Sequence, residues 1–186
     1  MRDLPFTICG VDDLDRLVTP KVSHVVSIID PGWPSIGALS RLPASRVHRF
    51  NFNDVIAPRD EHDTLPDASS VARIIEAGRA IRDDDPRHLL VHCQMGVSRS
   101  SAATLIILAE GHPGEEMTVA ERIMERRPQA WPNSLILELA DRELDRGGRL
   151  IEAGRAIRRN TARMQPDFAD YIRTTHRRAE AEDLGL

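Results

Sequence analysis

The stretch from Leu89 to Glu110 constrains the fold more than any other part of the chain. It reads LLVH, then the short loop CQMGVS, then RSSAATLIILAE. The first part is a nearly continuous apolar run, which is typical of a strand buried on both faces of a parallel sheet. The last part is a helix-like run, and Gly111 follows it as a stop signal. The stretch therefore predicts a buried strand, a loop and a helix in immediate succession.

Three runs nearer the start of the chain also predict strands, because each is apolar or alternating and is bounded by turn residues. They are Pro5–Cys9, Ser23–Ile29 and Arg46–Asp54. After the third run, the stretch PDASSVARIIEAGRAIR carries an apolar stripe at helical spacing, with Asp67 or Ser69 as its N-cap. The first half of the chain therefore mixes strands with helices.

Beyond Gly111 the pattern is helical throughout. The segments TVAERIMERRP and RLIEAGRAIRRN are helical, Asn133 caps a helix between them, and a further helical segment starts at Pro166. Strands interleaved with helices, followed by helices alone, predict an α/β fold. We expect a central, mostly parallel sheet flanked by helices, with a helical C-terminal half. Residues 1–165 are assigned to a single domain and residues 166–186 to a C-terminal helical tail.

The composition limits the partners that this chain can have. Its 186 residues suit one domain, and 41% hydrophobic with 29% charged residues is typical of a globular protein. A net charge of -4 provides no global basic field for nucleic acid or anionic lipid. No apolar run approaches the roughly 18 residues of a membrane helix, and the start, MRDLPFTICGVDDLDRL, has acids where a secretion signal needs an apolar core. We therefore expect a cytoplasmic protein without a nucleic-acid partner. The predominance of arginine over lysine suggests a bacterial, GC-rich genome.

The loop between the predicted strand and helix carries the chemistry. Cys93 and Arg99 enclose five residues: Gln94, Met95, Gly96, Val97 and Ser98. Backbone N–H groups at such a turn, together with the helix dipole, form an anion site. Gly96 lets the backbone curl close to the anion, and Arg99 offers a planar fork that matches two oxygens of phosphate or sulfate. The same positive field favours thiolate over thiol, so the loop predicts a nucleophile at the floor of a phosphate cradle.

The residues HCQMGVSRS resemble the signature His-Cys-x-x-Gly-x-x-Arg-Ser/Thr of cysteine-dependent protein tyrosine and dual-specificity phosphatases. RRPQAWPNSLILELA also resembles the Arg-Pro-x-x-x-Pro-Asn helix entry of many dual-specificity members. The two signals together cover Pro5 to about Leu144. The resemblance implies a catalytic domain, to which we assign residues 1–165, that hydrolyses phosphomonoesters through a phosphocysteine intermediate without a cofactor. The histidines show no paired ligand spacing, so no metal is expected.

The resemblance also implies a role for each matched position. Cys93 would be the nucleophile, and Arg99 would bind the phosphoryl oxygens and the transition state. His92 would hold the loop and help to tune the thiol, and Ser100 would assist breakdown of the intermediate. The residues from Gln94 to Ser98 would bind the phosphate through their backbone.

The implied reaction also needs an acid that protonates the leaving oxygen. The family places this acid as an aspartate on a mobile loop that precedes the cysteine. FNDVIAPRDEHD resembles the Phe-x-Asp-x-x-x-Pro form of that loop, which favours Asp54. Asp60 lies nearer to Cys93 and fits the shorter spacing of many members better, and Asp63 is a further candidate. We favour Asp54 over Asp60, with the choice still open.

Other functions share parts of this pattern. One is a phosphate-binding module that no longer turns over. Another is a sulfur-handling or arsenate-reducing enzyme, for which Cys9 is the only candidate resolving thiol. A third is a phosphoinositide phosphatase, which the uncharged interval between Cys93 and Arg99 disfavours.

The substrate prediction follows from the composition of the loop and from the scarcity of aromatic residues. Tyr171, the single tyrosine, lies in the tail. We therefore expect a shallow pocket with one fixed cation and neutral walls. Its substrate would be a phosphorylated protein or a small phosphomonoester, including both phosphotyrosine and phosphoserine/threonine. The basic cluster from Arg155 to Arg163 is interpreted as a solvated helix face rather than a site for an anionic partner.

Overall fold

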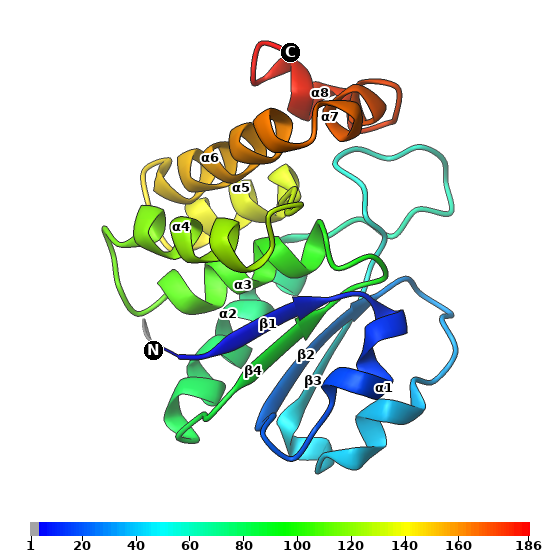
Figure 1. Ribbon diagram of the computed structural model, residues 1–186, viewed down its shortest axis with the longest axis vertical. Helices are drawn as coiled ribbons and strands as arrows, with labels where there is room; N and C mark the ends of the chain where they lie inside the picture. Colours follow the sequence, from blue (N-terminus) through cyan, green and yellow to red (C-terminus); the bar gives the residue numbers. More distant parts are fainter. Residues whose placement is uncertain (1–3) are drawn as a thin grey trace.

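The structure, a computed structural model, describes residues 4–186. These residues form a parallel sheet with helices on both faces (Figure 1). The strands are β1, Phe6–Cys9; β2, His24–Ile29; β3, Val47–Asn51; and β4, Leu89–His92. They are hydrogen-bonded in the order β1-β4-β2-β3, and every pairing is parallel. The predicted α/β class with a central parallel sheet is confirmed. Residues 1–3, part of the predicted domain and of the segment examined for a secretion signal, lie outside the described residues.

Strand β4 lies between β1 and β2, and all four of its residues are buried. This position explains its lack of polar alternation, because neither face of the strand meets water. In register, Cys9 of β1 and Ser27 of β2 lie beside His92 of β4. The carboxyl ends of these strands therefore meet at one edge of the sheet. Ligands of open parallel sheets bind at that edge, and Cys93 is the first residue beyond it.

The helices surround the sheet and extend beyond it. They are α1, Leu14–Leu17; α2, Ala68–Asp83; α3, Arg99–Ala109; α4, Glu116–Arg126; α5, Ser134–Glu143; α6, Arg149–Met164; α7, Pro166–Arg173; and α8, Arg178–Glu182. Asp67 caps α2 by accepting a hydrogen bond from the N–H of Ser70 at 2.7 Å. Asn133 caps α5 by accepting one from the N–H of Ile136 at 3.1 Å. Helix α1 and the 3₁₀ turns were not predicted, because they are too short to display a helical apolar stripe.

Two apolar clusters fill the two sides of the sheet. On one side, the helices from α2 to α6 pack over strand residues such as Phe6 and Val26. Every residue of α3 is buried there, including its polar first turn. On the other side, α1 and the 3₁₀ turn Gly37–Arg41 cover Val25 and Leu90. Successive side chains along one strand point to opposite faces of the sheet and therefore pack into different apolar clusters.

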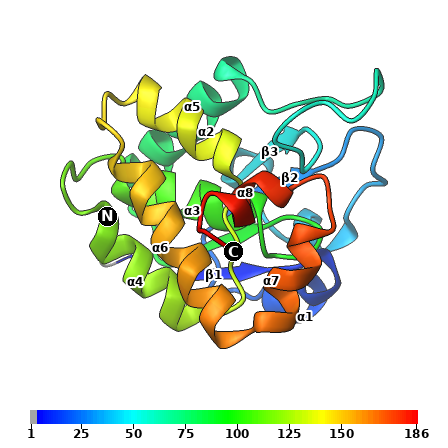
Figure 2. The same cartoon turned by 90° about the horizontal axis from the view of Figure 1, so that it is seen from above.

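A third apolar cluster attaches the C-terminal helices. In both ribbon views, α6, α7 and α8 form the outermost layer at one end of the molecule (Figures 1 and 2). Ala169, Ile172 and Ala181 are buried there around Trp131, and Val97 of the loop after β4 packs against them. The tail assigned to residues 166–186 forms α7 and α8, and its status as a unit separate from residues 1–165 stays a prediction.

Two arginines of α6 bind groups elsewhere in the protein. Arg158 is only 2% exposed and donates a hydrogen bond to the Pro132 carbonyl at 2.9 Å. Arg155 donates two hydrogen bonds to the carboxylate of Asp183, both at 2.6 Å. The interpretation of this cluster as a solvated helix face is therefore wrong for Arg158. Its guanidinium connects α6 to the chain before α5.

The end of β4 carries a buried histidine. His92 is inaccessible to solvent, and its Nε2 atom has no hydrogen-bond partner among residues 4–186. Burial lowers the pKa of His92 to about 4, with a smaller contribution in the same direction from Arg99, although the contact of Nδ1 with the Cys93 carbonyl opposes the shift. The ring is therefore neutral at neutral pH. Any effect of His92 on the Cys93 thiol must come from hydrogen bonding and packing rather than from charge.

This depressed pKa predicts an acid-sensitive fold. The unfolded chain takes up a proton on His92 near pH 6.5, whereas the folded protein resists protonation down to about pH 4. Stability is therefore complete above pH 6.5 and is lost as the pH falls toward 4, by roughly 3 kcal/mol. Urea unfolding of the wild type and of His92→Asn between pH 7 and pH 4 measures this loss. We expect a smaller loss in the variant, and equal losses would show that His92 is not the group responsible.

Candidate active site

The loop from Cys93 to Ser98 connects β4 to α3 at the carboxyl edge of the sheet. The carbonyl oxygens of Gln94, Met95 and Gly96 accept hydrogen bonds from the Val11 N–H and from the Arg127 guanidinium at 2.8–2.9 Å. Because a trans peptide points its C=O and N–H in opposite directions, the N–H groups that follow these carbonyls face away from those partners. The loop therefore presents its N–H groups to its own interior, as an anion cradle requires.

Gly96 is the residue that permits this curl. Its φ of +67° lies in the left-handed region, and a Cβ at this position would lie 2.3 Å from the carbonyl carbon of Cys9. No side chain fits at that separation. The loop is thus pressed against the end of β1, and the sequence-based reason for the glycine agrees with the geometry.

Cys93 lies at the floor of a cavity of about 400 Å³. Its side chain is only 2% exposed, and its Sγ atom is 3.2 Å from Oγ of Ser100 in the first turn of α3. At this separation the serine hydroxyl can donate to a thiolate. Of the predicted loop residues, the cavity lining includes Gln94, Met95, Val97 and Ser98, together with Arg99.

The guanidinium of Arg99 is buried beside the thiol and is only partly satisfied by protein groups. Its Nη1 atom donates to Oδ1 of Asp30 and to the Phe52 carbonyl, both at 2.6 Å. Its Nη2 atom donates to Oε1 of Gln94 at 3.1 Å. The Nε atom has no hydrogen-bond partner among residues 4–186. A buried donor without an acceptor is costly, and an oxygen of a bound anion would satisfy it.

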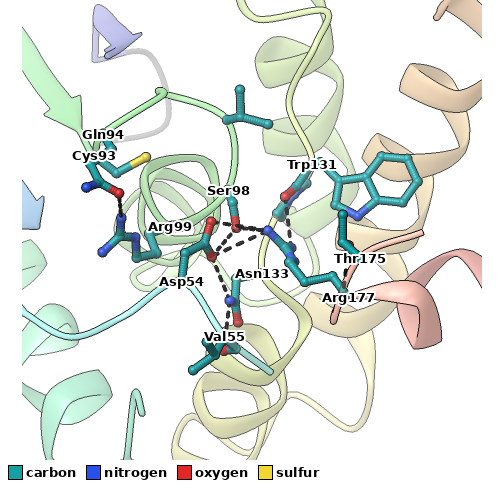
Figure 3. A network of polar contacts seen from close by, with 12 residues as sticks. Asp54, Val55, Cys93, Gln94, Ser98, Arg99, Trp131, Asn133, Thr175 and Arg177 are labelled. Carbon is teal, nitrogen blue, oxygen red and sulfur yellow. Dashed lines mark hydrogen bonds and ion pairs between the residues drawn. The ribbon is translucent and has the colours of Figure 1, made fainter. Parts of the chain in front are cut away.

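Asp54 lies across the cavity from the thiol, after β3, and its carboxylate is held from three sides (Figure 3). Ser98 donates to Oδ1 at 2.6 Å, and the amide of Asn133 donates to the same oxygen at 3.0 Å. Arg177 lies 3.3 Å from Oδ2. Burial would raise the pKa of Asp54, but Arg177 and Arg99, with the hydrogen bonds of Ser98 and Asn133, lower it below its ordinary value.

The alternative acids lie elsewhere in the same long loop. Asp60 is exposed and accepts a hydrogen bond from the backbone N–H of His62 at 2.8 Å. Asp63 forms an ion pair with Arg59, whose side-chain and backbone hydrogen bonds hold the pKa of that carboxyl well below its usual range. Within the described residues, Asp54 lines the cavity and these two aspartates do not.

The structure corrects the expected character of the pocket. Phe168 and Tyr171 of α7 line the cavity, and so do Arg59 and Arg177. The expectation of one fixed cation and neutral walls is therefore wrong, and the pocket has an aromatic wall that was not predicted. Its charged and aromatic groups come from the tail and from the loop after β3, so no local sequence pattern around Cys93 could reveal them.

Asp30 is a second residue that the sequence analysis missed. It directly follows β2, a strand that the sequence predicts to be buried, and it therefore lies at the same edge as Cys93. That position is the signal that could have identified it. Asn133 was predicted only as a helix cap, yet its amide also reaches Asp54 while its side-chain oxygen caps α5.

Cys9 does not share the cavity with Cys93. It belongs to the apolar cluster on the α1 side of the sheet, whereas Cys93 belongs to the cluster on the α3 side. Burial raises the pKa of the Cys9 thiol to about 12, with Asp13 adding to the shift. Both features disfavour Cys9 as a resolving thiol.

Within the described part of the chain, neither a metal-binding cluster nor a membrane-spanning helix is found. Within residues 4–186, no three histidine, cysteine, aspartate or glutamate side chains are grouped so that they could hold a metal ion. No helix in the same range combines the length and the apolarity needed to cross a bilayer. The donors at the cavity are cations and N–H groups, which suit an anion.

Comparisons with known proteins identify relatives of this fold. No family model matches the sequence. Human protein phosphatase Slingshot homolog 3 is 30% identical over 125 residues, a match that spans 65% of this chain but 16% of the length of that relative. The Yvh1 phosphatase domain from Chaetomium thermophilum superposes with a TM-score of 0.57 at 22% identity, over 78% of this chain and 93% of that one. Human DUSP28 superposes with a TM-score of 0.55 at 15% identity, over 75% and 91% of the two chains. The chain therefore has the fold of dual-specificity phosphatases.

Proposed function

We propose that this protein is a cysteine-dependent phosphatase of the protein tyrosine and dual-specificity type, which hydrolyses phosphomonoesters through a phosphocysteine intermediate. One observation carries the proposal. A buried thiol and a buried guanidinium with an unsatisfied Nε donor line one cavity. The loop between them has its carbonyl oxygens bound by Val11 and Arg127, so the N–H groups that follow these carbonyls face away from those partners. This arrangement supplies a nucleophile, a fork for phosphoryl oxygens and a backbone cradle together.

In the first step, Sγ of Cys93 attacks the phosphorus as the bond to the leaving oxygen breaks. Arg99 and the loop N–H groups bind the three equatorial oxygens, where charge accumulates in a loose transition state. The proton of Asp54 passes to the leaving oxygen. Asp54 is ionised in the free protein, but a phosphoryl dianion bound in the same cavity disfavours the carboxylate and promotes its protonation.

In the second step, a water molecule attacks the phosphorus and the P–S bond breaks. Asp54, now a carboxylate, takes the proton from the water. Ser100 donates its hydrogen bond to the departing thiolate over the 3.2 Å that separate the two side chains. Inorganic phosphate leaves and Asp54 releases its proton to solvent, so the site returns to its starting state. A phosphate-binding module without turnover would not need both Asp54 and Ser100 in these positions.

The lining of the cavity favours a phosphorylated aromatic group. Phe168 and Tyr171 supply one wall, and aromatic pairs gain energy beyond the area that they bury. A multiply phosphorylated inositol lipid would need free cations around the cavity. Arg59 and Arg177 do not serve in this way, because the first is paired with Asp63 and the second with Asp54 and Glu180. Phosphotyrosine in proteins is therefore the proposed substrate, with phosphoserine/threonine and small phosphomonoesters as weaker ones.

Replacement of the nucleophile tests the covalent mechanism. Cys93→Ser should lose turnover of a phosphotyrosine peptide and still bind inorganic phosphate, because Arg99 and the N–H cradle remain. Steady-state kinetics and calorimetric titration with phosphate measure the two properties. Cys9→Ser is the matched control and should retain activity, since its thiol lies on the other face of the sheet. Residual activity of Cys93→Ser above about a thousandth of the wild type would exclude the mechanism.

The choice between the two aspartates is tested by the leaving group. Asp54→Asn should slow hydrolysis of phenyl phosphate by roughly a hundredfold to a thousandfold, because a phenolate needs protonation as it leaves. The loss should be much smaller for p-nitrophenyl phosphate, whose leaving group is more acidic. Asp60→Asn is the control and should leave both rates unchanged. The reverse pattern in the two variants would assign the acid to Asp60.

A further inference from the structure

Arg177 lies in the turn between α7 and α8, yet its guanidinium reaches the catalytic cavity. The side chain is 7% exposed and lies 123 positions along the chain from Asp54. Its Nη1 atom donates to Oγ of Ser98 at 2.5 Å and lies 3.3 Å from Oδ2 of Asp54. Ser98 in turn donates to Oδ1 of Asp54. The three side chains thus form a closed triangle of polar contacts, which Figure 3 shows.

The opposite edge of the same guanidinium is anchored in the tail. Its Nε and Nη2 atoms donate to the carboxylate of Glu180 at 2.9 and 2.8 Å. Glu180 also accepts hydrogen bonds from the indole N–H of Trp131 at 2.8 Å and from the backbone N–H of Ser134 at 2.7 Å. Glu180 is itself buried. A buried carboxylate with this many donors fixes the position of Arg177 before any substrate arrives.

We propose that Arg177 is a positioning residue of the active site: by pairing with Asp54 and bonding to Ser98, it holds the Asp54 carboxyl group beside the phosphate loop. The C-terminal segment from Pro166 to Glu182 thereby contributes to the active site by supplying this positioning residue. The catalytic meaning of this inference rests on the proposed function. The placement of the carboxyl group itself can be measured without turnover.

The contacts around Asp54 are of two kinds: some orient the carboxylate, and others stabilise its negative charge. Asn133 and Ser98 donate neutral hydrogen bonds, which orient the carboxylate. Arg177 adds a full positive charge at ion-pair distance. Arg99 faces the same group from the first turn of α3, and the ring of His176 contacts the Asp54 carbonyl at 3.1 Å. The same cavity is also lined by two further charged groups, Asp30 and Arg59, by the thiol of Cys93 and by the phenol of Tyr171.

Because Arg177 is a cation close to a carboxylate, its removal should raise the pKa of Asp54. An opposite charge at this range shifts a carboxyl pKa by about one to three units. The loss of Arg177 should therefore move the alkaline limb of the rate profile to higher pH, since protonated Asp54 then persists further. It should also reduce the rate at the optimum, because the acid is less well oriented. A purely structural role would reduce the rate without moving the limb.

The first measurement needs no activity. Carbon-13 NMR of the Asp54 carboxyl carbon, in protein labelled at aspartate, gives its titration midpoint in the wild type and in Arg177→Gln. We expect a midpoint below about 3.9, the usual value for aspartate, in the wild type, and a midpoint higher by about one unit or more in the variant. A wild-type midpoint at or above the usual value would overturn the proposal, even if the variant did not fold. So would the same midpoint in both proteins.

The second measurement is a double-mutant cycle on phenyl phosphate. If Arg177 acts through Asp54, then Asp54→Asn combined with Arg177→Gln should be no slower than Asp54→Asn alone. Multiplied losses would overturn the proposal, and so would a loss in Arg177→Gln that does not depend on the leaving group. Inactive wild-type protein would refute the proposed phosphatase function instead, and the NMR titration would still decide the placement of Asp54.

Three further variants separate charge from packing. Arg173→Gln removes an exposed arginine of the same segment, paired only with Asp170 among the described residues, and should behave as the wild type. Glu180→Gln loosens the anchor of the tail but keeps the cation, so it should lower the melting temperature without raising the Asp54 midpoint. Arg177→Lys keeps the charge and should restore a low midpoint. A raised midpoint in Glu180→Gln equal to that in Arg177→Gln would show that packing of the tail, and not the cation, controls Asp54.

Discussion

The parallel pairing of β1, β4 and β2 brings three strand ends to one edge of the sheet, and the whole site is built on that edge. The loop after β4 is held against the end of β1 by the bond from the Val11 N–H to the Gln94 carbonyl and by the close approach of Gly96 to Cys9. Asp30 follows β2 directly and meets Arg99 there. A slip of one residue in either pairing would turn alternate side chains to the opposite face. The shape of the loop is therefore set by the register of the sheet as well as by its own residues.

Positive and negative groups alternate in the site, and its two arginines are buried. Arg99 lies against Asp30, and Arg177 lies between Asp54 and Glu180. Removing such groups from water costs several kcal/mol for each ion unless a partner compensates. Apolar side chains of similar volume would stabilise a fold at least as well. The retention of two paired arginines next to a thiol is thus difficult to explain by stability and is readily explained by chemistry on an anion.

The local sequence predicts this protein well where structure depends on neighbours in the chain. The apolar run of β4, the helix cap at Asn133 and the glycine of the loop depend on residues nearby in the sequence. All three are predicted from the sequence. Asp30 could also have been inferred, because it directly follows a predicted buried strand. Arg177 could not, since it lies in a segment with arginines at 173, 177 and 178 and nothing in the pattern separates the buried one from the exposed ones. Phe168 and Tyr171 were missed for the same reason, because their neighbours in space lie far away in sequence.

The distance of Arg177 from its partners has a consequence for the order in which the site is completed during synthesis. Chains are made from the N-terminus and domains fold as they emerge. Strands β1 to β4, the phosphate loop and Asp54 are all present while Arg177, 123 residues after Asp54, has yet to be added. The nucleophile can thus be in place before its acid is held beside it. Because Val97 and Ser98 of the loop also contact this late segment, the loop gains its last packing and hydrogen-bonding partners only when that segment has been made.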